Sequence, residues 1–178
     1  YVNTHTAMNI KKEILSEIAI YSGEVEPPEG FEINRESLAL DVLTFQAKDS
    51  KNFPFSKTLD VLNTYLREHI NLKYRFQLIS KNIRGTAYKS KETSFPLLNV
   101  DPMDLIHSAD YTLLYGIEVE KCSVRILYDD NRNTGRVRAL PLETNKFILF
   151  PSTQTYYIIN NNRANSLNFI QTIIYESI

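Results

Sequence analysis

The sequence predicts an α+β protein in which two N-terminal helices support an antiparallel β-sandwich of about eight strands. Two observations lead to this class. Apolar residues recur at helical spacing within the first 72 residues but alternate with a period of two from residue 73 onward, and the later segments are short and joined by turn-forming residues. The most natural closure of such strands is a small jelly roll. We therefore expect a single domain over residues 1–178, with 1–72 helical and 73–178 forming the β-sandwich core.

The N-terminal part contains two segments with helical spacing. The first covers residues 9–21, has isoleucine at every fourth position on one face, and is expected to end at Gly23. The second begins with Ser56 as its cap and carries an apolar stripe that ends near Asn71. Between them, residues 38–46 mix apolar and β-branched side chains and are short enough to predict a strand.

The C-terminal part reads as strands separated by turns. Strands are predicted at residues 74–79, 82–89, 111–119, 122–128, 136–142, 146–150, 155–159 and 167–175. Gly85 interrupts the second of these and is expected to mark a bulge. Residues 129–135 and 160–162 are rich in Asp, Asn and Gly, which are typical of tight connections.

Charge and composition exclude several classes of partner. Lys and Arg number 20 against 21 Asp and Glu and are interleaved with them, so we expect no nucleic-acid partner. No apolar run approaches the ~18 residues of a membrane span, so we expect no membrane partner. The single Cys122 excludes a disulfide framework and fits a reducing compartment, which predicts a cytoplasmic location. Abundant Ile, Asn, Lys and Tyr are typical of an AT-rich genome; for a viral protein the location would be the host cytoplasm and the virion.

One family resemblance rests on the order and spacing of residues 99–174. Asn99-Val100-Asp101-Pro102 precedes an apolar strand at 111–117, and a buried apolar strand at 146–150 is followed by Pro151 and Ser152. In this layout the chain resembles the core of the iron(II)- and 2-oxoglutarate-dependent oxygenases, particularly their prolyl-hydroxylase-like branch. The resemblance implies a double-stranded β-helix whose N-terminal helices buttress one sheet. It also implies a His-x-Asp loop, a second metal-binding His, and a basic residue on the last strand that pairs with the co-substrate carboxylate.

The resemblance places Asn99 and Asp101 at the His-x-Asp positions and Tyr156, or a near neighbour, at the second His. Arg163 stands nearest to the basic position, in the turn before the last strand. A non-haem iron site needs two imidazoles and one carboxylate, and only Asp101 matches. An amide is a poor iron ligand, a phenol would have to lose its proton, and no histidine follows His107. We therefore predict a degenerate site with no metal, no cofactor and no catalytic residue.

These observations favour a catalytically silent oxygenase-like scaffold that acts as a protein-binding or structural module, with a protein partner or a second copy of itself. A phage virion is one setting, since this chain resembles small oxygenase-like proteins of large tailed phages. One alternative is an active oxygenase in which Asp101 and Tyr156 hold Fe(II) and Arg163 binds 2-oxoglutarate. Another is a carbohydrate-binding jelly roll that uses four tyrosines at one end. These are Tyr88, Tyr115, Tyr156 and Tyr157.

Three further groups have an ordinary structural interpretation beside a functional one. His107 and Asp110 are ligand types, but their spacing is one residue longer than His-x-Asp. The carboxylates of Asp101, Asp104 and Asp110 are suited to a hard cation, but Asp in such a loop is more typical of turn formation. Five arginines on predicted strands are suited to an anion but are more typical of the solvated face of a sheet. They are Arg75, Arg84, Arg125, Arg136 and Arg138.

Overall fold

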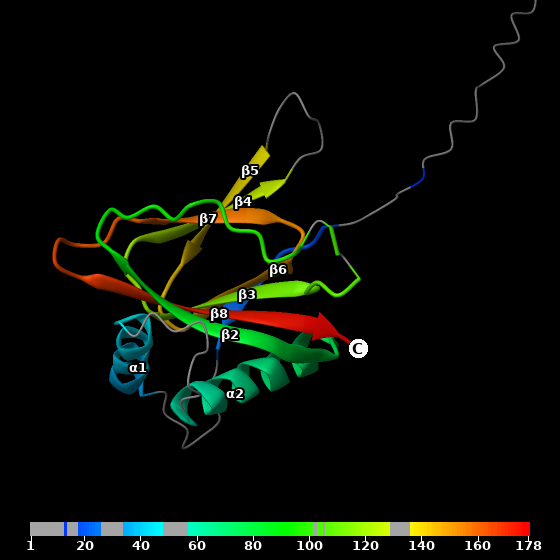
Figure 1. The fold of residues 1–178 in the computed structure, drawn as a ribbon, viewed down its shortest axis with the longest axis horizontal. Helices are drawn as coiled ribbons and strands as arrows, with labels where there is room; N and C mark the ends of the chain where they lie inside the picture. Colours follow the sequence, from blue (N-terminus) through cyan, green and yellow to red (C-terminus); the bar gives the residue numbers. More distant parts are fainter. Residues whose placement is uncertain are drawn as a thin grey trace, which may run out of the picture.

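The computed structural model describes residues 13, 18–25, 34–47, 57–101, 103–104, 106–128 and 136–178. Within these ranges the chain forms two helices, α1 (Arg35–Ala47) and α2 (Lys57–Tyr74), and eight strands. The strands are β1 (Tyr21–Glu24), β2 (Leu78–Lys89), β3 (Tyr111–Glu118), β4 (Cys122–Tyr128), β5 (Arg136–Leu142), β6 (Lys146–Pro151), β7 (Thr155–Asn160) and β8 (Leu167–Ser177). Both helices lie on the same side of the strands, along β2 and β8 (Figure 1).

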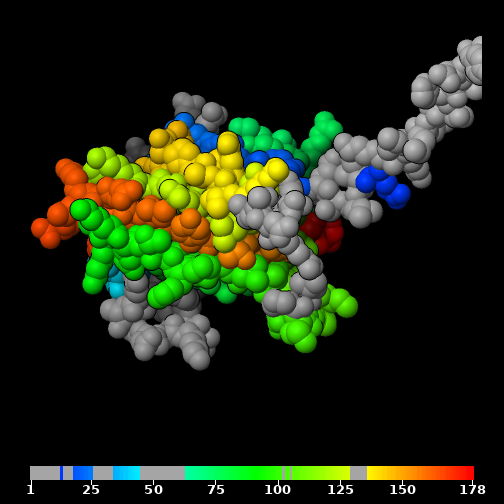
Figure 2. Space-filling model, turned by 90° about the horizontal axis from the view of Figure 1, so that it is seen from above, coloured from blue at the N-terminus to red at the C-terminus, as the bar shows by residue number. Residues whose placement is uncertain are grey.

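The strands form two antiparallel sheets. The five-stranded sheet has the order β1-β6-β3-β8-β2, and the three-stranded sheet has the order β5-β4-β7. The connections from β3 to β4, β5 to β6, β6 to β7 and β7 to β8 each cross from one sheet to the other. This alternation is the topology of a double-stranded β-helix, so the predicted fold class is confirmed. Figure 2 shows the open face of the smaller sheet, where β5 (yellow) and β7 (orange) lie at the surface.

Two apolar cores follow from the alternation of side chains along the strands. Odd-numbered residues of β3, such as Leu113 and Tyr115, pack toward α1 and α2. Even-numbered residues, such as Leu114, point between the sheets. The interior core between the sheets contains eleven buried residues: Tyr88, Leu114, Cys122, Val124, Ile126, Leu142, Ile148, Phe150, Tyr156, Ile158 and Ile170.

The prediction of a strand at residues 38–46 is wrong, because this segment forms most of α1. Leu38 and Val42 are fully buried and lie four residues apart on one face, while Leu40 is exposed. Asn34 caps the helix, since its Oδ1 accepts a hydrogen bond from the amide of Ser37 at 3.0 Å. The spacing of four residues between the apolar side chains and the cap residue Asn34 both indicate a helix. The β-branched residues Val42 and Thr44 favoured a strand, but the contact of α1 with the sheet outweighs that preference.

The predicted helix at 9–21 is also wrong where the structure describes it. Residues 18–20 have no regular structure, and Tyr21–Glu24 form β1, which pairs with β6. The remainder of that prediction, apart from residue 13, lies outside the described residues. The second helix is confirmed, although α2 continues to Tyr74 and its predicted cap Ser56 lies outside the described residues. No helix among the described residues is long and apolar enough to cross a membrane.

The six predicted strands from residue 111 onward are confirmed as β3 to β8, with ends that shift by at most two residues. The predicted strand at 74–79 is wrong for its first four residues, since β2 begins at Leu78 and continues as one strand to Lys89. The bulge in β2 lies between Ser80 and Asn82 and not at Gly85. Residues 129–135 lie outside the described residues, so the predicted turn there stays a prediction.

Gly85 has a packing role. A Cβ atom built at this position would overlap Cγ2 of Val42 in α1. The missing side chain therefore allows the helix to approach β2 closely enough for Val42 to become buried.

We predict that Gly85→Ala lowers the free energy of unfolding by about 1–3 kcal/mol, because the added methyl overpacks the contact with α1. In a Val42→Ala background the same substitution should cost clearly less, since space is then available. Urea unfolding of the wild type, both single variants and the double variant measures this coupling. Strictly additive effects would show that α1 does not pack on Gly85.

Candidate functional site

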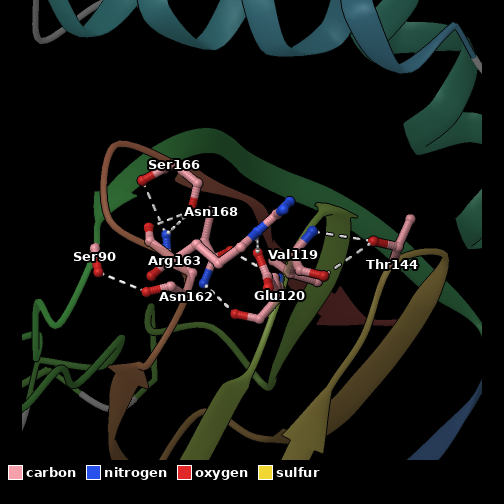
Figure 3. Close-up of polar contacts among 8 residues, drawn as sticks. All are labelled: Ser90, Val119, Glu120, Thr144, Asn162, Arg163, Ser166 and Asn168. Carbon is pink, nitrogen blue, oxygen red and sulfur yellow. Dashed lines mark hydrogen bonds and ion pairs between the residues drawn. The ribbon is translucent and has the colours of Figure 1, made fainter.

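The interior core lies between two groups of polar side chains, one at each end of the roll. The first group lies where β3 and β7 begin and is called the mouth cluster. It consists of Arg84, Asn99, Thr112, Ser152 and Tyr156. The second group lies at the far end, in the turns that follow β3, β5 and β7 (Figure 3). Of the predicted metal and co-substrate positions, Asn99 and Tyr156 belong to the mouth cluster and Arg163 lies at the far end.

Asn99 is placed by the segment that joins β2 to β3. Leu97 and Tyr156 exchange backbone hydrogen bonds of 2.7 and 3.0 Å, which dock this segment on β7. The amide of Asn99 then reaches both sheets. Its Nδ2 donates to Thr112 Oγ1 on β3 at 3.1 Å and to Tyr156 Oη on β7 at 3.3 Å.

The third contact of Asn99 comes from β2. Arg84 Nη2 donates to Asn99 Oδ1 at 3.0 Å. On the other side of the cluster, Thr112 Oγ1 lies 2.8 Å from Ser152 Oγ, and both residues are fully buried. The five side chains thus form one continuous hydrogen-bonded network across the mouth of the roll.

The charge of the mouth cluster comes from Arg84, because its other members are an amide and three hydroxyl groups. Tyr88 lies in the interior core nearby, and burial raises the pKa of its hydroxyl to about 12 although the guanidinium of Arg84 opposes this rise. A guanidinium stays protonated at every physiological pH. The cluster is therefore neutral apart from one fixed positive charge.

Asp101 lies close to Asn99 in sequence, but its carboxylate forms a hydrogen bond within its own loop. Its Oδ1 accepts a hydrogen bond from the amide of Met103 at 2.9 Å, and its backbone amide donates to Ser108 Oγ at 2.9 Å. The side chain is exposed. The structure therefore brings Asn99 and Tyr156 together and holds Asp101 in a turn at the surface.

His107 and Asp110 do not pair with each other. His107 Nδ1 lies 2.9 Å from Asp104 Oδ1, and Asp110 Oδ2 accepts a hydrogen bond from the amide of Ser177 at 2.7 Å. These contacts fit the turn-forming interpretation of the acidic residues. Among the described residues, no three or more His, Cys, Asp and Glu side chains are grouped so that they could hold a metal ion.

Arg163 lies at the far end of the roll, in the turn between β7 and β8, as the sequence placed it. Its Nε lies 3.1 Å from Glu120 Oε2, and its side chain is 81% exposed (Figure 3). The neighbouring Asn168 anchors this end, because its Nδ2 donates to Glu120 O and to Asn160 Oδ1. The length of β7 separates Arg163 from Tyr156, so the structure does not bring Arg163 to the mouth cluster.

The four tyrosines do not form one wall. Tyr88 and Tyr156 are buried between the sheets, and the ring of Tyr156 packs against Phe150 with centroids 5.1 Å apart. Tyr115 points to the opposite face of β3, into the core beneath the helices, where its hydroxyl donates to Asn145 Oδ1 at 2.9 Å. The expected tyrosine-lined end is therefore absent.

Arg84, Thr112 and Ser152 were missed as site residues in the sequence. Of the two interpretations of Arg84, the solvated sheet face does not hold, because the side chain is half-buried and shares the inward face of β2 with Tyr88. The period of two over 82–89 was the available signal, because it places Arg84 on the same face as an aromatic residue. Nothing local to Thr112 distinguishes it from other strand residues, and Ser152 lies in the turn after β6, where the sequence indicated only the turn itself.

The fold is that of the iron(II)- and 2-oxoglutarate-dependent oxygenases, as the resemblance predicted. A Pseudomonas putida prolyl-4-hydroxylase matches 88% of this chain and 91% of its own, with 12% sequence identity and a TM-score of 0.60. AviO1 from Streptomyces viridochromogenes Tue57 matches 89% of this chain and 90% of its own, with 14% identity and a TM-score of 0.59. A Trichoplax adhaerens prolyl hydroxylase, in complex with a hypoxia inducible factor peptide, matches 88% and 83%, with 10% identity and a TM-score of 0.57. No protein-family model and no curated protein matches the sequence.

The fold family implies an iron ion, and the residues at the mouth do not fit one. Both polar atoms of the Asn99 amide are engaged by protein groups, and Tyr156 presents a fully buried phenol. Arg84 contributes a guanidinium, which offers only donors and cannot ligate a cation. This set lacks the imidazoles that an iron(II) site of this kind requires.

We predict that the unfolding temperature falls as pH rises from about 9 toward 12. Burial raises the pKa of the Cys122 thiol from 9.0, and of the Tyr88 and Tyr115 hydroxyls from 10.0, to about 12. Each group is protonated in the folded chain where the unfolded chain ionises, so its stabilising contribution is complete below the unfolded pKa and declines above it.

Thermal melts between pH 7 and 11.5 measure this decline. Tyr88→Phe should reduce its steepness, while Tyr157→Phe, at a half-buried position on β7, serves as the matched control. An unfolding temperature that stays constant up to pH 11.5 would contradict the assignment of these buried groups.

Proposed function

We propose that this protein is a catalytically silent oxygenase-like scaffold that acts as a protein-binding or structural module. One observation carries the proposal: the amide of Asn99, which the resemblance places at the position of an imidazole, forms hydrogen bonds with Arg84, Thr112 and Tyr156. The amide nitrogen donates and cannot ligate a cation, and the amide oxygen, a poor iron ligand, already accepts a hydrogen bond from a positively charged group. Conservation of the fold does not require conservation of the chemistry, because the core and the ligands are different residues.

Protein contact is supported by the apolar side chains of the segment between β2 and β3. Phe95, Met103 and Ile106 are each about nine-tenths exposed. Large apolar side chains that gather in one exposed segment are typical of interaction sites. We propose that this segment contacts a protein partner or a second copy of the chain, and a phage particle is one setting for such a module.

We predict that the purified protein, supplied with Fe(II), ascorbate and 2-oxoglutarate, forms no succinate above the rate of protein-free buffer. The physical reason is the ligand set at the mouth, which offers an amide and a phenol in place of two imidazoles. Mass spectrometry measures succinate, and calorimetry measures binding of 2-oxoglutarate to the iron-supplied protein. Succinate formation with stoichiometric iron would overturn the proposal and favour the active oxygenase, with Asp101 and Tyr156 as ligands and Arg163 as the co-substrate contact.

We predict that the triple variant Phe95→Ser, Met103→Ser and Ile106→Ser loses the protein contact that the wild type makes. Sedimentation velocity measures self-association, and affinity capture followed by mass spectrometry measures retained partners. Leu40→Ser removes an exposed apolar side chain from α1 and is the matched control. If all three proteins sediment identically and retain the same partners, contact through this segment is wrong.

A further inference from the structure

A positively charged side chain lies inside the mouth of the roll. Arg84 is directly opposite Thr172 of β8 in the register of the sheet. Residues of β2 that alternate with Arg84 point between the sheets, as buried Tyr88 does. Arg84 is on β2 of the five-stranded sheet and Tyr156 is on β7 of the three-stranded sheet, so the amide of Asn99 is contacted from both sheets.

We propose that the guanidinium of Arg84 takes the place of the metal ion. It fixes the segment that carries Asn99, and it excludes a divalent cation from the mouth even when imidazole ligands are supplied. This inference rests on the proposed function, since it explains how an oxygenase fold maintains its open end without iron. Arg84 is not one of the three positions that the resemblance assigns to metal ligands, so its role is separate from theirs.

The fixing role follows from the hydrogen bonds. The resemblance implies that a metal ion would have ligands on both the Asn99 segment and β7, whereas here the amide of Asn99 makes that connection through Tyr156 Oη. Arg84 engages the other end of the same amide, so Asn99 is held from both sides. A hydrogen bond from a charged donor is stronger than a neutral one, and a half-buried position protects it from solvent.

The exclusion follows from charge and distance. Arg84 Nη2 lies 3.0 Å from Asn99 Oδ1, the side chain that stands at the first ligand position. A divalent cation bound there would be within a few ångströms of a group that cannot release its proton. Repulsion at that separation is only partly screened when the charges are partly buried. Replacing the missing imidazoles would therefore not by itself create a metal site.

The test restores the imidazoles and then removes the guanidinium. Asn99→His with Tyr156→His gives the double variant, and adding Arg84→Met gives the triple variant. Calorimetry and visible absorption report the binding of Co(II), which needs no oxygen or 2-oxoglutarate. We expect the triple variant to bind one Co(II) at least tenfold more tightly than the double variant. The double variant with Arg125→Met, which removes an exposed arginine from β4, should behave like the double variant alone.

Equal affinity of the double and triple variants for Co(II) would overturn the exclusion role of Arg84 and leave the proposed function intact. Succinate formation by the wild type would instead overturn the proposed function, so the two failures are distinguishable.

The unfolding temperature tests whether Arg84 fixes the Asn99 segment. This measurement does not depend on the folding of the triple variant. Arg84→Met alone should lower the unfolding temperature by about 5 °C, because Asn99 Oδ1 loses its charged partner. Arg84→Lys should recover part of this loss, and Arg125→Met should change the unfolding temperature by no more than about 1 °C. An unchanged unfolding temperature for Arg84→Met would show that the guanidinium does not hold this segment.

Discussion

Burial of both faces of β3 and β8 is the constraint on which the structure depends. Residues 112–117 of β3 and 168–175 of β8 are all buried. An antiparallel sheet with two apolar faces needs a cover on each side, because either face would otherwise meet water. The two helices cover one face, and the three-stranded sheet covers the other. Two polar residues of β8, Gln171 and Thr172, are buried in the middle of the strand, while Thr112 of β3 and Asn168 of β8 lie near strand ends and join the polar groups at the two ends of the roll.

An asparagine joins the two sheets at each end of the roll. At the mouth, Asn99 contacts Thr112 in the larger sheet and Tyr156 in the smaller one. At the far end, Asn168 of β8 donates to Asn160 of β7. An amide suits this position because it carries two donors and an acceptor, and polar groups next to an apolar interior must find partners within the protein.

The oxygenase fold and the oxygenase chemistry make separate demands on a sequence. The fold is shared with a prolyl-4-hydroxylase at 12% identity, which shows how little it depends on particular residues beyond the pattern of the core. A metal site depends on a few side chains of defined chemistry. At the mouth of this roll, Asn99 preserves the hydrogen bonding that positions a segment between the sheets, and Arg84 brings a positive charge to the same place. Under the proposed function, these groups maintain the geometry of the open end without supplying ligands for iron.

The sequence by itself determined the strands from residue 111 onward and the helix α2. Through the family resemblance it also indicated that Asn99 and Tyr156 lie close together in space. These elements could be predicted because the spacing of apolar residues and the composition of turns are local properties of a sequence. The family resemblance indicated how the strands are connected. Only the tertiary structure decided that Tyr21–Glu24 form a strand, since β1 is four residues long and its hydrogen-bond partners belong to β6, more than 120 residues away. Only the tertiary structure decided that Arg84 faces inward. The period of two places Arg84 and Tyr88 on one face of β2, but which face of an edge strand is covered depends on the elements that pack against it.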